Sequence, residues 1–554
     1  MMNKKTILDF FKRNRMDFLA FFLYAIVASV IFFNFLKNIS NAILPGDGIF
    51  TYWVLSWDIH SFLNHPLDIF NANIFYPNAN TLAYSEGFFA PALLLLPFYL
   101  VFRNLVPVYN LAIVFSYVIA AFGAFKFAKY YTKNNYASLI AGLIFGFATF
   151  RVANGHFQNI IIFWMPFAAL NLQKYFDGRK RKHLIIFALL FSGQMLTSWT
   201  MGAFFALFVA FLLVVNWRLI YADIAPIAGD MLLALVVITI LVVPFAYPYF
   251  KLHQETNFSY PVWEMIDGSA DIGGYVLPVP GSTESPLLSF FGIRKVHWGE
   301  NMNFLGYFSM LLLTYYILFG KNKIREKNFK IFFWGIPIFI LLSFGPVLRS
   351  FSAFTITLPY RVLVPFLGFI RSPNRLALIV LLCLSVSVAY ILTAFRPKNR
   401  SLKFVLGAIV PAVILFEFYL PYGTFPDNTA CPEIYSRVKN YTSVRAIAEL
   451  PVFAGATVDK NLGYMFNSTC DGFIPIFNGY SGYYPPNFGP SSEIINDFPE
   501  KESLEELSES KISHVILHLD SYPEEKRVPL LETIRKSGQM KVEYQSGSDY
   551  LIKI

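Results

Sequence analysis

One acidic residue is distinguished by its surroundings. Asp47 lies in the stretch LPGDGIFTYW, between two glycines and directly after the first long apolar run. A carboxylate at a membrane boundary can meet a lipid-borne headgroup while it remains accessible to water, and flanking glycines permit tight turns and close approach of a substrate. Because Asp is also a favoured N-cap residue, a cap on a helix that starts near Ile49 explains the same pattern.

Two more carboxylates follow in the same segment, Asp58 in SWDIHSF and Glu86 in LAYSEGFF. Two carboxylates in one site can act as a base and as a metal ligand or orienting group, so we predict that both bind substrate. The alternative is an amphipathic helix at the membrane surface, with Trp53 and Trp57 in the interface and the acids in water.

A second polar group lies between two apolar runs, in FRVANGHFQNIIIFW. Arg151, His156 and Gln158 fall within eight positions. Polar groups at the end of a span are costly unless they face a cavity or a ligand, so we predict that these three residues bind substrate. His156 and Gln158 are two positions apart, which suits hydrogen bonding better than metal ligation. Alternatively, Arg151 extends to lipid phosphates.

Residues 348–375 contain four arginines and no lysine, namely Arg349, Arg361, Arg371 and Arg375. The guanidinium group binds phosphate through two parallel hydrogen bonds, and its weak hydration suits a membrane boundary. Anchoring at the membrane surface explains any single arginine, but it explains the absence of lysine less well. The stretch therefore predicts a phosphate site, for which Arg361, Arg371 and Arg375 are the candidates.

The composition indicates the class of protein that positions these residues. Of the 554 residues, 56% are apolar and only 14% are charged, whereas soluble domains carry about 25% charged residues. A single water-soluble globule is excluded. The net charge of +10 does not indicate nucleic acid, because the basic residues fall between apolar runs, as expected for membrane topology.

Eleven apolar runs approach the roughly 20 residues that span a bilayer. They are residues 18–36, 106–125, 136–152, 158–176, 183–199, 201–217, 229–248, 304–319, 330–347, 374–395 and 402–420. A further run, 88–102, is shorter and contains Pro91 and Pro97. The sequence predicts a mainly α polytopic membrane protein.

Clusters of Lys and Arg mark the cytoplasmic side. Five such clusters lie at residues 4–15, 126–133, 174–182, 321–330 and 396–403. All five fall on one side only if residues 88–102 form a re-entrant or interfacial helix, which places the N-terminus in the cytoplasm and the C-terminus outside. The long external loops are then 37–105 and 249–303. The second of these loops, 249–303, contains several acidic residues, but their spacing does not distinguish a catalytic acid from the acids of a solvated loop.

The C-terminal part differs from the rest, since residues 421–554 hold 12 Lys/Arg and 18 Asp/Glu. We predict a transmembrane domain over 1–420 and a small extracytoplasmic α/β domain over 421–554. Its strand is expected at 511–519, its helix at 523–538 and a hairpin at 540–554. The Tyr-rich loop 477–490 suits stacking on a sugar or simple packing. Outside the cytoplasm, Cys431 and Cys470 can pair.

Several stretches resemble one family. GDGIFTYWVLSW, NIFYPNANTLAYSE, FRVANGHFQNIIIFWMPF, LPYRVLVPFLGFIRSPNRLAL and NGYSGYYPP are similar to a bacterial branch of the GT-C type membrane glycosyltransferases. The resemblance implies a sugar donor on a polyprenyl phosphate and assigns the role of catalytic base to Asp47. Other branches carry an acid where this chain has His156 and Gln158, which favours a site without metal, so no cofactor is expected, although a divalent metal remains an alternative.

The expected function is transfer of a sugar from a polyprenyl-phosphate donor to an extracytoplasmic glycan, lipid or protein, in the cell membrane. Membrane lipids are the other expected partners. A transporter or flippase of lipid-linked glycans would use the same arginines, but the chain has no internal repeat and almost no acid within its spans. A non-catalytic anchor for the C-terminal domain would leave the acids of the first loop without a role.

Overall fold

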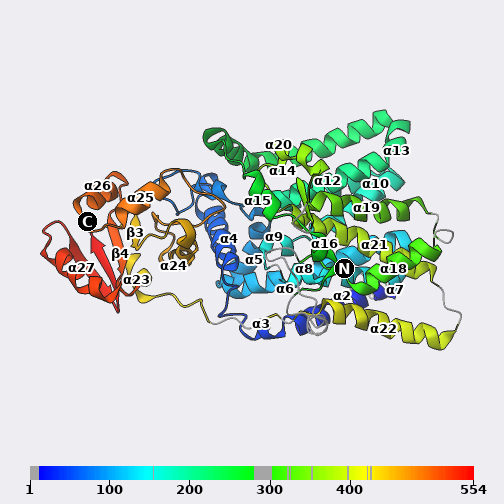
Figure 1. Ribbon diagram of the computed structural model, residues 1–554, viewed down its shortest axis with the longest axis horizontal. Coiled ribbons are helices and arrows are strands. Elements are labelled where there is room, and N and C mark those ends of the chain that lie inside the picture. The colour runs from blue at the N-terminus through cyan, green and yellow to red at the C-terminus, as the bar shows by residue number, and fades with distance from the viewer. Residues whose placement is uncertain are drawn as a thin grey trace, which may run out of the picture. The chain divides into compact units, whose positions relative to one another are not determined.

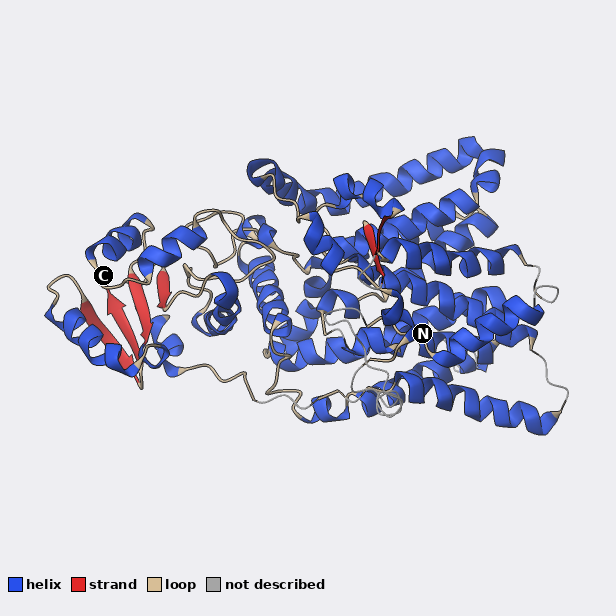
Figure 2. Cartoon of the chain, viewed as in Figure 1, coloured by secondary structure: helices blue, strands red, loops and turns tan. Residues whose placement is uncertain are grey.

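The computed structural model describes residues 12–153, 155–279, 302–320, 324, 326–350, 354–395, 399–420, 422–423 and 427–554. Figure 1 labels its elements along the chain, and Figure 2 distinguishes helices from strands. The chain divides into two compact units. The first comprises Met1–Lys37, Asn110–Pro244 and Asn257–Thr424, and the second comprises Asn38–Tyr109, Phe245–Thr256 and Phe425–Ile554.

The first unit is almost entirely helical. Its α-helices are α2 (Arg15–Ile31), α3 (Phe33–Lys37), α7 (Asn135–Phe147), α8 (Thr149–Ala153), α9 (Phe157–Ile160), α10 (Trp164–Gly178), α11 (Arg181–Met195), α12 (Trp199–Val215), α13 (Trp217–Ala222), α15 (Val262–Asp267), α16 (Ile272–Val276), α18 (Tyr307–Tyr315), α19 (Lys327–Ser343), α20 (Val364–Leu367), α21 (Ala377–Ala394) and α22 (Arg400–Phe418). Its shorter elements are the π-helix η3 (Tyr316–Gly320), the 3-10 helices η4 (Pro359–Val362) and η5 (Pro373–Leu376), and the paired strands β1 (Val347–Ser350) and β2 (Phe354–Thr357). Helices α6 (Leu105–Thr132) and α14 (Ile224–Thr256) contribute residues to both units.

Helix α21 forms the core of the first unit. It is apolar on every face and is buried from Ala377 to Ile391, as expected of a helix surrounded by others. It packs against α7 and α19. A side chain at Gly335 of α19 would come within 2.8 Å of Cys383 Sγ, so the two helices approach closely at a glycine. Cys383 is buried here, as its apolar surroundings predict.

Four of the described helices are long and apolar enough to cross a bilayer, and they are Leu105–Thr132, Asn135–Ala153, Ile224–Thr256 and Pro373–Ala394. The mainly helical architecture is confirmed, whereas the total of eleven spans stays a prediction. Helix α5 (Phe89–Phe102) covers the run that we expected to be re-entrant. Its 14 residues extend about 21 Å at 1.5 Å per residue, which is short of the roughly 30 Å of a hydrocarbon core.

The second unit combines helices with a sheet. In chain order its elements are α4 (Asp47–Asn64), η1 (Pro66–Asp68), η2 (Thr81–Tyr84), α5, α23 (Glu433–Val438), β3 (Ile447–Leu450), η6 (Gly455–Lys460), α24 (Asn461–Asp471), α25 (Phe488–Ile495), α26 (Lys501–Glu509), β4 (His514–His518), η7 (Leu519–Ser521), α27 (Glu524–Lys536), β5 (Lys541–Ser546) and β6 (Asp549–Lys553).

The four strands of this unit lie in the order β3-β4-β6-β5, and they are the larger group of red arrows in Figure 2. Strands β3 and β4 are parallel, with Glu449 opposite Ile516. Strand β6 is antiparallel to both β4 and β5. The predicted strand, helix and hairpin of the C-terminal region are thus confirmed as β4, α27 and β5–β6. Strand β3 is not among the elements that the sequence predicts.

The first long loop belongs to the same compact unit as the C-terminal residues. Asn428 pairs with the backbone of Ile43 through both side-chain atoms, at 2.8 and 3.0 Å. The Phe75 amide donates to the Asn478 carbonyl at 3.2 Å. This unit is therefore larger than the predicted domain 421–554, because its loops make backbone hydrogen bonds with residues of the first loop.

A disulfide joins Cys431 to Cys470, with the Cα atoms 6.0 Å apart. The bond ties the segment before α23 to the end of α24. The pairing that the sequence left open is therefore present in the structure.

Candidate active site

Asp47 is the first residue of α4. Gly46 is the N-cap of this helix and no side chain caps it, so the N-cap interpretation of Asp47 is wrong and the helix begins two residues earlier than expected. The side chain of Asp47 is half-buried. The positive end of the helix dipole stabilises a carboxylate in the first turn, so the position favours an ionised Asp47.

The two flanking glycines are required for different reasons. Gly46 has φ +63°, a left-handed conformation that L side chains rarely adopt. A Cβ atom at Gly48 would lie 2.3 Å from Leu44 Cβ. The Gly48 carbonyl accepts a hydrogen bond from the Tyr109 hydroxyl at 3.2 Å. The turn that presents Asp47 is therefore specified by backbone geometry and close packing.

Asp58 lies eleven residues further along the same helix and is fully buried. Its Oδ2 accepts a hydrogen bond from the Phe88 amide at 3.1 Å. Burial raises the pKa of Asp58 well above its ordinary value, although this hydrogen bond opposes the shift. Asp58 thus holds the backbone just after Glu86, and its predicted contact with substrate stays a prediction.

Glu86 is half-buried in a short loop between η2 and α5. Both amides that follow it are bound by side chains from elsewhere, since Gly87 donates to the Tyr249 hydroxyl at 2.9 Å and Phe88 donates to Asp58. The loop is therefore held at two successive residues. This arrangement fixes the backbone that carries Glu86, whose predicted role in substrate binding is a proposal.

The interfacial alternative for this helix is wrong. Trp53 has no exposed surface and Trp57 is only 4% exposed. The indole of Trp57 donates to the Ile69 carbonyl at 2.7 Å. Both tryptophans are core residues of the second unit, in which α4 packs against α5 and α24. Asp68, by contrast, is exposed to solvent.

Arg151 is fully buried in the first unit. Its guanidinium donates to the carbonyls of Gly146 at 2.7 Å and Ile160 at 2.6 Å. The Gly146 carbonyl belongs to the last turn of α7, where backbone acceptors lack helical partners and the dipole favours a cation. The guanidinium also lies 4.6 Å from the ring centre of Tyr117. Extension of this side chain to lipid phosphates is therefore excluded in this structure.

These contacts position the turn that carries His156 and Gln158. Arg151 bonds to the carbonyl of Ile160, and the Ser116 hydroxyl donates to the same oxygen at 2.9 Å. His156 is the N-cap residue of α9, and its side chain and that of Gln158 are half-buried. The described contacts of Arg151 are thus structural, whereas His156 and Gln158 have exposed surface that a ligand can reach.

The arginines of residues 348–375 differ in exposure. Arg361 and Arg371 are exposed, whereas Arg375 is only 6% exposed. Arg371 lies 5.8 Å from the ring centre of Tyr260. Two exposed apolar side chains, Val362 at 73% and Phe366 at 76%, follow Arg361 closely. Exposed cations beside exposed apolar groups suit contact with a lipid headgroup.

The RSPNR turn is held by the segment around α15. The Asn374 amide donates to the Gly268 carbonyl at 3.1 Å, and a Cβ atom at Gly268 would lie 2.3 Å from the Arg371 carbonyl oxygen. In the same segment Asp271 caps α16 through a 2.6 Å bond to the Gly274 amide. The part of the loop that contains Glu284, His297 and Glu300 lies outside the described residues.

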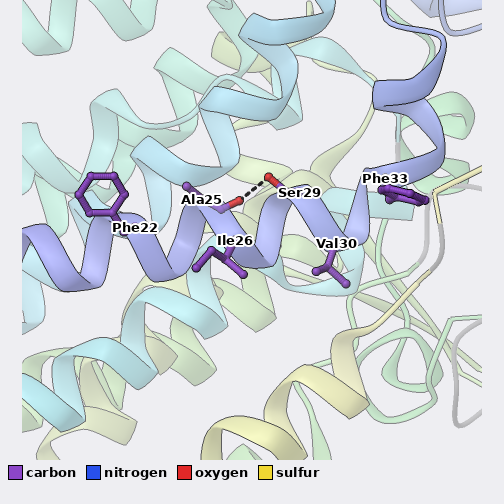
Figure 3. A pocket seen from close by; sticks show the side chains of 6 residues that line it. All are labelled: Phe22, Ala25, Ile26, Ser29, Val30 and Phe33. Atoms are coloured by element: carbon purple, nitrogen blue, oxygen red, sulfur yellow. Dashed lines mark hydrogen bonds between the residues drawn. The ribbon is translucent and has the colours of Figure 1, made fainter.

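A groove of about 470 Å³ is lined by residues of α2 and by Phe33, the first residue of α3 (Figure 3). Its lining is apolar except for Ser29, whose hydroxyl donates to the Ala25 carbonyl at 2.9 Å. Such a surface can contact hydrocarbon but offers no reactive group. Within the described part of the chain, no cluster of three His, Cys, Asp or Glu residues is placed to hold a metal ion.

One contact of Asp47 is not predicted by the sequence. The Tyr480 hydroxyl lies 3.5 Å from Asp47 Oδ1, 433 residues along the chain, in the Tyr-rich loop 477–490. No local signal connects the two residues.

Comparisons with known proteins place the fold. No protein-family model matches the sequence, and no curated protein matches it. The oligosaccharyltransferase AglB from Archaeoglobus fulgidus, solved with an inhibitory peptide and a dolichol-phosphate, aligns with a TM-score of 0.51 and 12% identity, over 92% of this chain and 70% of that chain. The arabinofuranosyltransferase AftD from Mycobacteria aligns with a TM-score of 0.57 and 12% identity, over 98% of this chain and 41% of that chain.

Both of these proteins are GT-C type glycosyltransferases. The chain has a GT-C type fold. The resemblance drawn from the sequence motifs is confirmed at the level of fold, although identity is only 12%. The four described helices that are long and apolar enough to cross a bilayer agree with a polytopic membrane protein of this fold.

Proposed function

We propose that this protein is a membrane glycosyltransferase that moves a sugar from a polyprenyl-phosphate donor to an extracytoplasmic glycan, lipid or protein. The observation that carries the proposal is a GT-C type fold in which a half-buried carboxylate, Asp47, begins the helix of the first long loop. The dolichol-phosphate in the AglB structure and the glycosyl transfer named for AftD support a lipid-linked donor.

In the proposed reaction, the acceptor hydroxyl oxygen attacks the anomeric carbon of the donor sugar. Asp47 takes the proton of that hydroxyl as the new glycosidic bond forms, which requires an ionised carboxylate within hydrogen-bonding reach. The bond between the anomeric carbon and the phosphate oxygen breaks, and polyprenyl phosphate leaves with the bonding electron pair. The position of Asp47 in the first turn of α4 favours the ionised form that this step needs.

Negative charge develops on the departing phosphate, where cations fixed in advance have their greatest effect. We propose Arg361 and Arg371 for this role, because both are exposed and lack neighbouring lysines. Arg375 is buried in the same turn and is proposed to support it from within. Since a guanidinium binds phosphate at two oxygens and an ammonium at one, substitution of Arg371 by Lys is expected to lower kcat/KM, and Arg371→Ala is expected to lower it roughly 10²-fold.

We further propose that the protein lies in the cell membrane with its N-terminus in the cytoplasm and its C-terminal residues outside. The disulfide between Cys431 and Cys470 supports this orientation, since disulfides form and persist in oxidising compartments. The charge pattern of the loops supports it independently.

The proposal is tested by transfer from a labelled polyprenyl-phosphosugar in isolated membranes. Asp47→Asn removes the base and keeps the side-chain volume, so transfer is expected to fall by about 10²–10⁴-fold. The matched control is Asp68→Asn, in the same loop and exposed, which should leave transfer unchanged. Transfer that survives Asp47→Asn contradicts the role of Asp47. Movement of the labelled lipid across the membrane without transfer indicates a flippase.

We propose that the reaction needs no divalent metal, because His156 and Gln158 occupy the turn where other branches of the family carry an acid. Treatment of the membranes with EDTA should leave the transfer rate unchanged. Loss of transfer with EDTA, followed by recovery on addition of Mn²⁺ or Mg²⁺, would contradict this expectation.

A further inference from the structure

The loop that carries Tyr480 is held rigidly within the second unit. The Asn478 side chain makes two hydrogen bonds with the backbone of Glu449. Its nitrogen donates to the Glu449 carbonyl at 2.8 Å, and its oxygen accepts from the Glu449 amide at 2.8 Å. Asn461 donates to the Gly479 carbonyl at 2.9 Å. Each of these side chains is fully buried, so the backbone around Tyr480 is defined by β3 and α24.

Close packing restricts the same loop further. A Cβ atom at Gly479 would lie 2.5 Å from the ring of Phe75, so only glycine fits there without displacement of the ring. The Tyr480 amide lies 3.1 Å from the sulfur of Met465. The direction in which Tyr480 leaves the backbone is therefore set by its neighbours on both sides.

Tyr480 makes two contacts with the first turn of α4. Its ring packs edge-on against Phe50, with the ring centres 5.6 Å apart and an angle of 75° between the planes. Its hydroxyl lies 3.5 Å from Asp47 Oδ1. A distance of 3.5 Å is long for this bond, and hydrogen bonds of catalytic groups are often long before substrate binds. The ring contact keeps the hydroxyl directed at Asp47.

We propose that Tyr480 is a positioning residue, which orients the Asp47 carboxylate and stabilises its ionised form by donating a hydrogen bond to Oδ1. The inference rests on the proposed role of Asp47 as base and extends it, because a residue of the C-terminal region becomes part of the site. A donor to a carboxylate favours the charged form over the protonated form. Removal of the hydroxyl should therefore let Asp47 take up a proton at a higher pH.

The test uses the full-length protein in detergent and a reagent that needs no sugar donor. Dicyclohexylcarbodiimide modifies protonated carboxyl groups, so labelling of Asp47, measured by peptide mass spectrometry between pH 4 and pH 9, reports its protonation. Tyr480→Phe keeps the ring on Phe50 and removes only the hydroxyl. We expect the pH of half-maximal labelling to rise by about 0.5–1 unit.

The matched control is Tyr464→Phe. The Tyr464 hydroxyl lies 3.4 Å from the Pro451 carbonyl in the same unit, so its loss should leave the labelling of Asp47 unchanged. An unshifted midpoint in Tyr480→Phe, or an equal shift in Tyr464→Phe, overturns the inference. Because labelling requires no transfer, this failure is distinct from failure of the proposed function, which Asp47→Asn tests by transfer alone.

Discussion

At the scale of single residues, two aspartates of α4 have the same side chain and different environments. Asp47 is half-buried in the first turn, whereas Asp58 is fully buried and accepts a hydrogen bond from the Phe88 amide. Burial raises the pKa of Asp58 well above its ordinary value, although the hydrogen bond from the Phe88 amide opposes the shift. An asparagine at this position keeps an acceptor oxygen for that amide and places no charge in the buried site.

Asp58→Asn is therefore expected to leave both the transfer rate and the unfolding temperature nearly unchanged, because the Asn oxygen still accepts from the Phe88 amide. Asp58→Leu leaves that amide without a partner and should lower the free energy of unfolding by about 1–3 kcal/mol. Thermal unfolding in detergent measures both variants. A strong loss of transfer in a stable Asp58→Asn would show instead that Asp58 acts on substrate as a carboxylate.

Arg151 provides a second prediction at this scale. Its guanidinium bonds to carbonyls at the end of α7 and in α9. Arg151→Met removes both bonds at a cost of about 1–3 kcal/mol, although the Ile160 oxygen keeps its bond from the Ser116 hydroxyl. We expect a clear fall in the unfolding temperature. Arg151→Lys should restore only part of the lost unfolding temperature, since one ammonium cannot reach both carbonyls in the same geometry. An unchanged unfolding temperature together with lost donor binding would indicate direct contact with phosphate.

At the scale of elements, one histidine links three strands of the second unit. His518 of β4 bonds to Glu449 of β3 and to Asp549 of β6, each at 2.8 Å. Tyr435 of α23 donates to the same Glu449 carboxylate at 2.6 Å, and Tyr464 of α24 stacks on the imidazole. The three strands are thus joined by an ion-pair network in which Glu449 is fully buried and Asp549 is partly exposed.

Burial disfavours the charged form of His518, but its hydrogen bonds to Asp549 and Glu449 outweigh this effect and raise its pKa to about 9. A pKa raised above the unfolded value of roughly 6.5 means that the network contributes its full stability below that pH and loses it as the pH rises through about 9. The unfolding temperature should therefore fall between pH 7 and pH 10. His518→Gln should flatten that dependence, and an equal slope in this variant would contradict the assignment.

The disulfide is a second feature of element scale. It closes the chain over a separation of 39 residues between Cys431 and Cys470, which corresponds to about 4 kcal/mol by loop-closure entropy. Cys431→Ser is expected to lower the unfolding temperature, and wild-type protein should fall to the same value after reduction. A reducing agent that leaves the wild type unchanged would show that the bond adds no stability.

At the scale of the whole molecule, the orientation in the membrane is the property to test. Of the three cysteines, Cys383 is buried and the other two are bonded to each other, so a single added cysteine can be labelled against a low background. A membrane-impermeant maleimide should label Lys526→Cys from outside intact cells and label Lys180→Cys only after permeabilisation. Both positions are exposed. Labelling of Lys180→Cys in intact cells would reverse the proposed topology.

The sequence alone determined the apolar helices, β4, α27 and the β5–β6 hairpin. These features depend on hydrophobic length, short-range periodicity and turn residues, which are local properties of the chain. The GT-C type of fold was predicted from the resemblance of several stretches to that family. Arg361, Arg371 and Arg375 were selected as phosphate-binding candidates from residue type, because lysine is absent over residues 348–375. Their different exposure to solvent is known only from the structure.

The tertiary structure decided which polar residues are buried and which segments share a compact unit. Trp53 and Trp57 become core residues, and the guanidinium of Arg151 bonds to backbone carbonyls, because neighbouring helices cover them in a way that no local pattern encodes. The contact of Tyr480 with Asp47 spans 433 residues. Such a pair is brought together by the packing of strand, loop and helix, which depends on the whole unit and not on any segment of it.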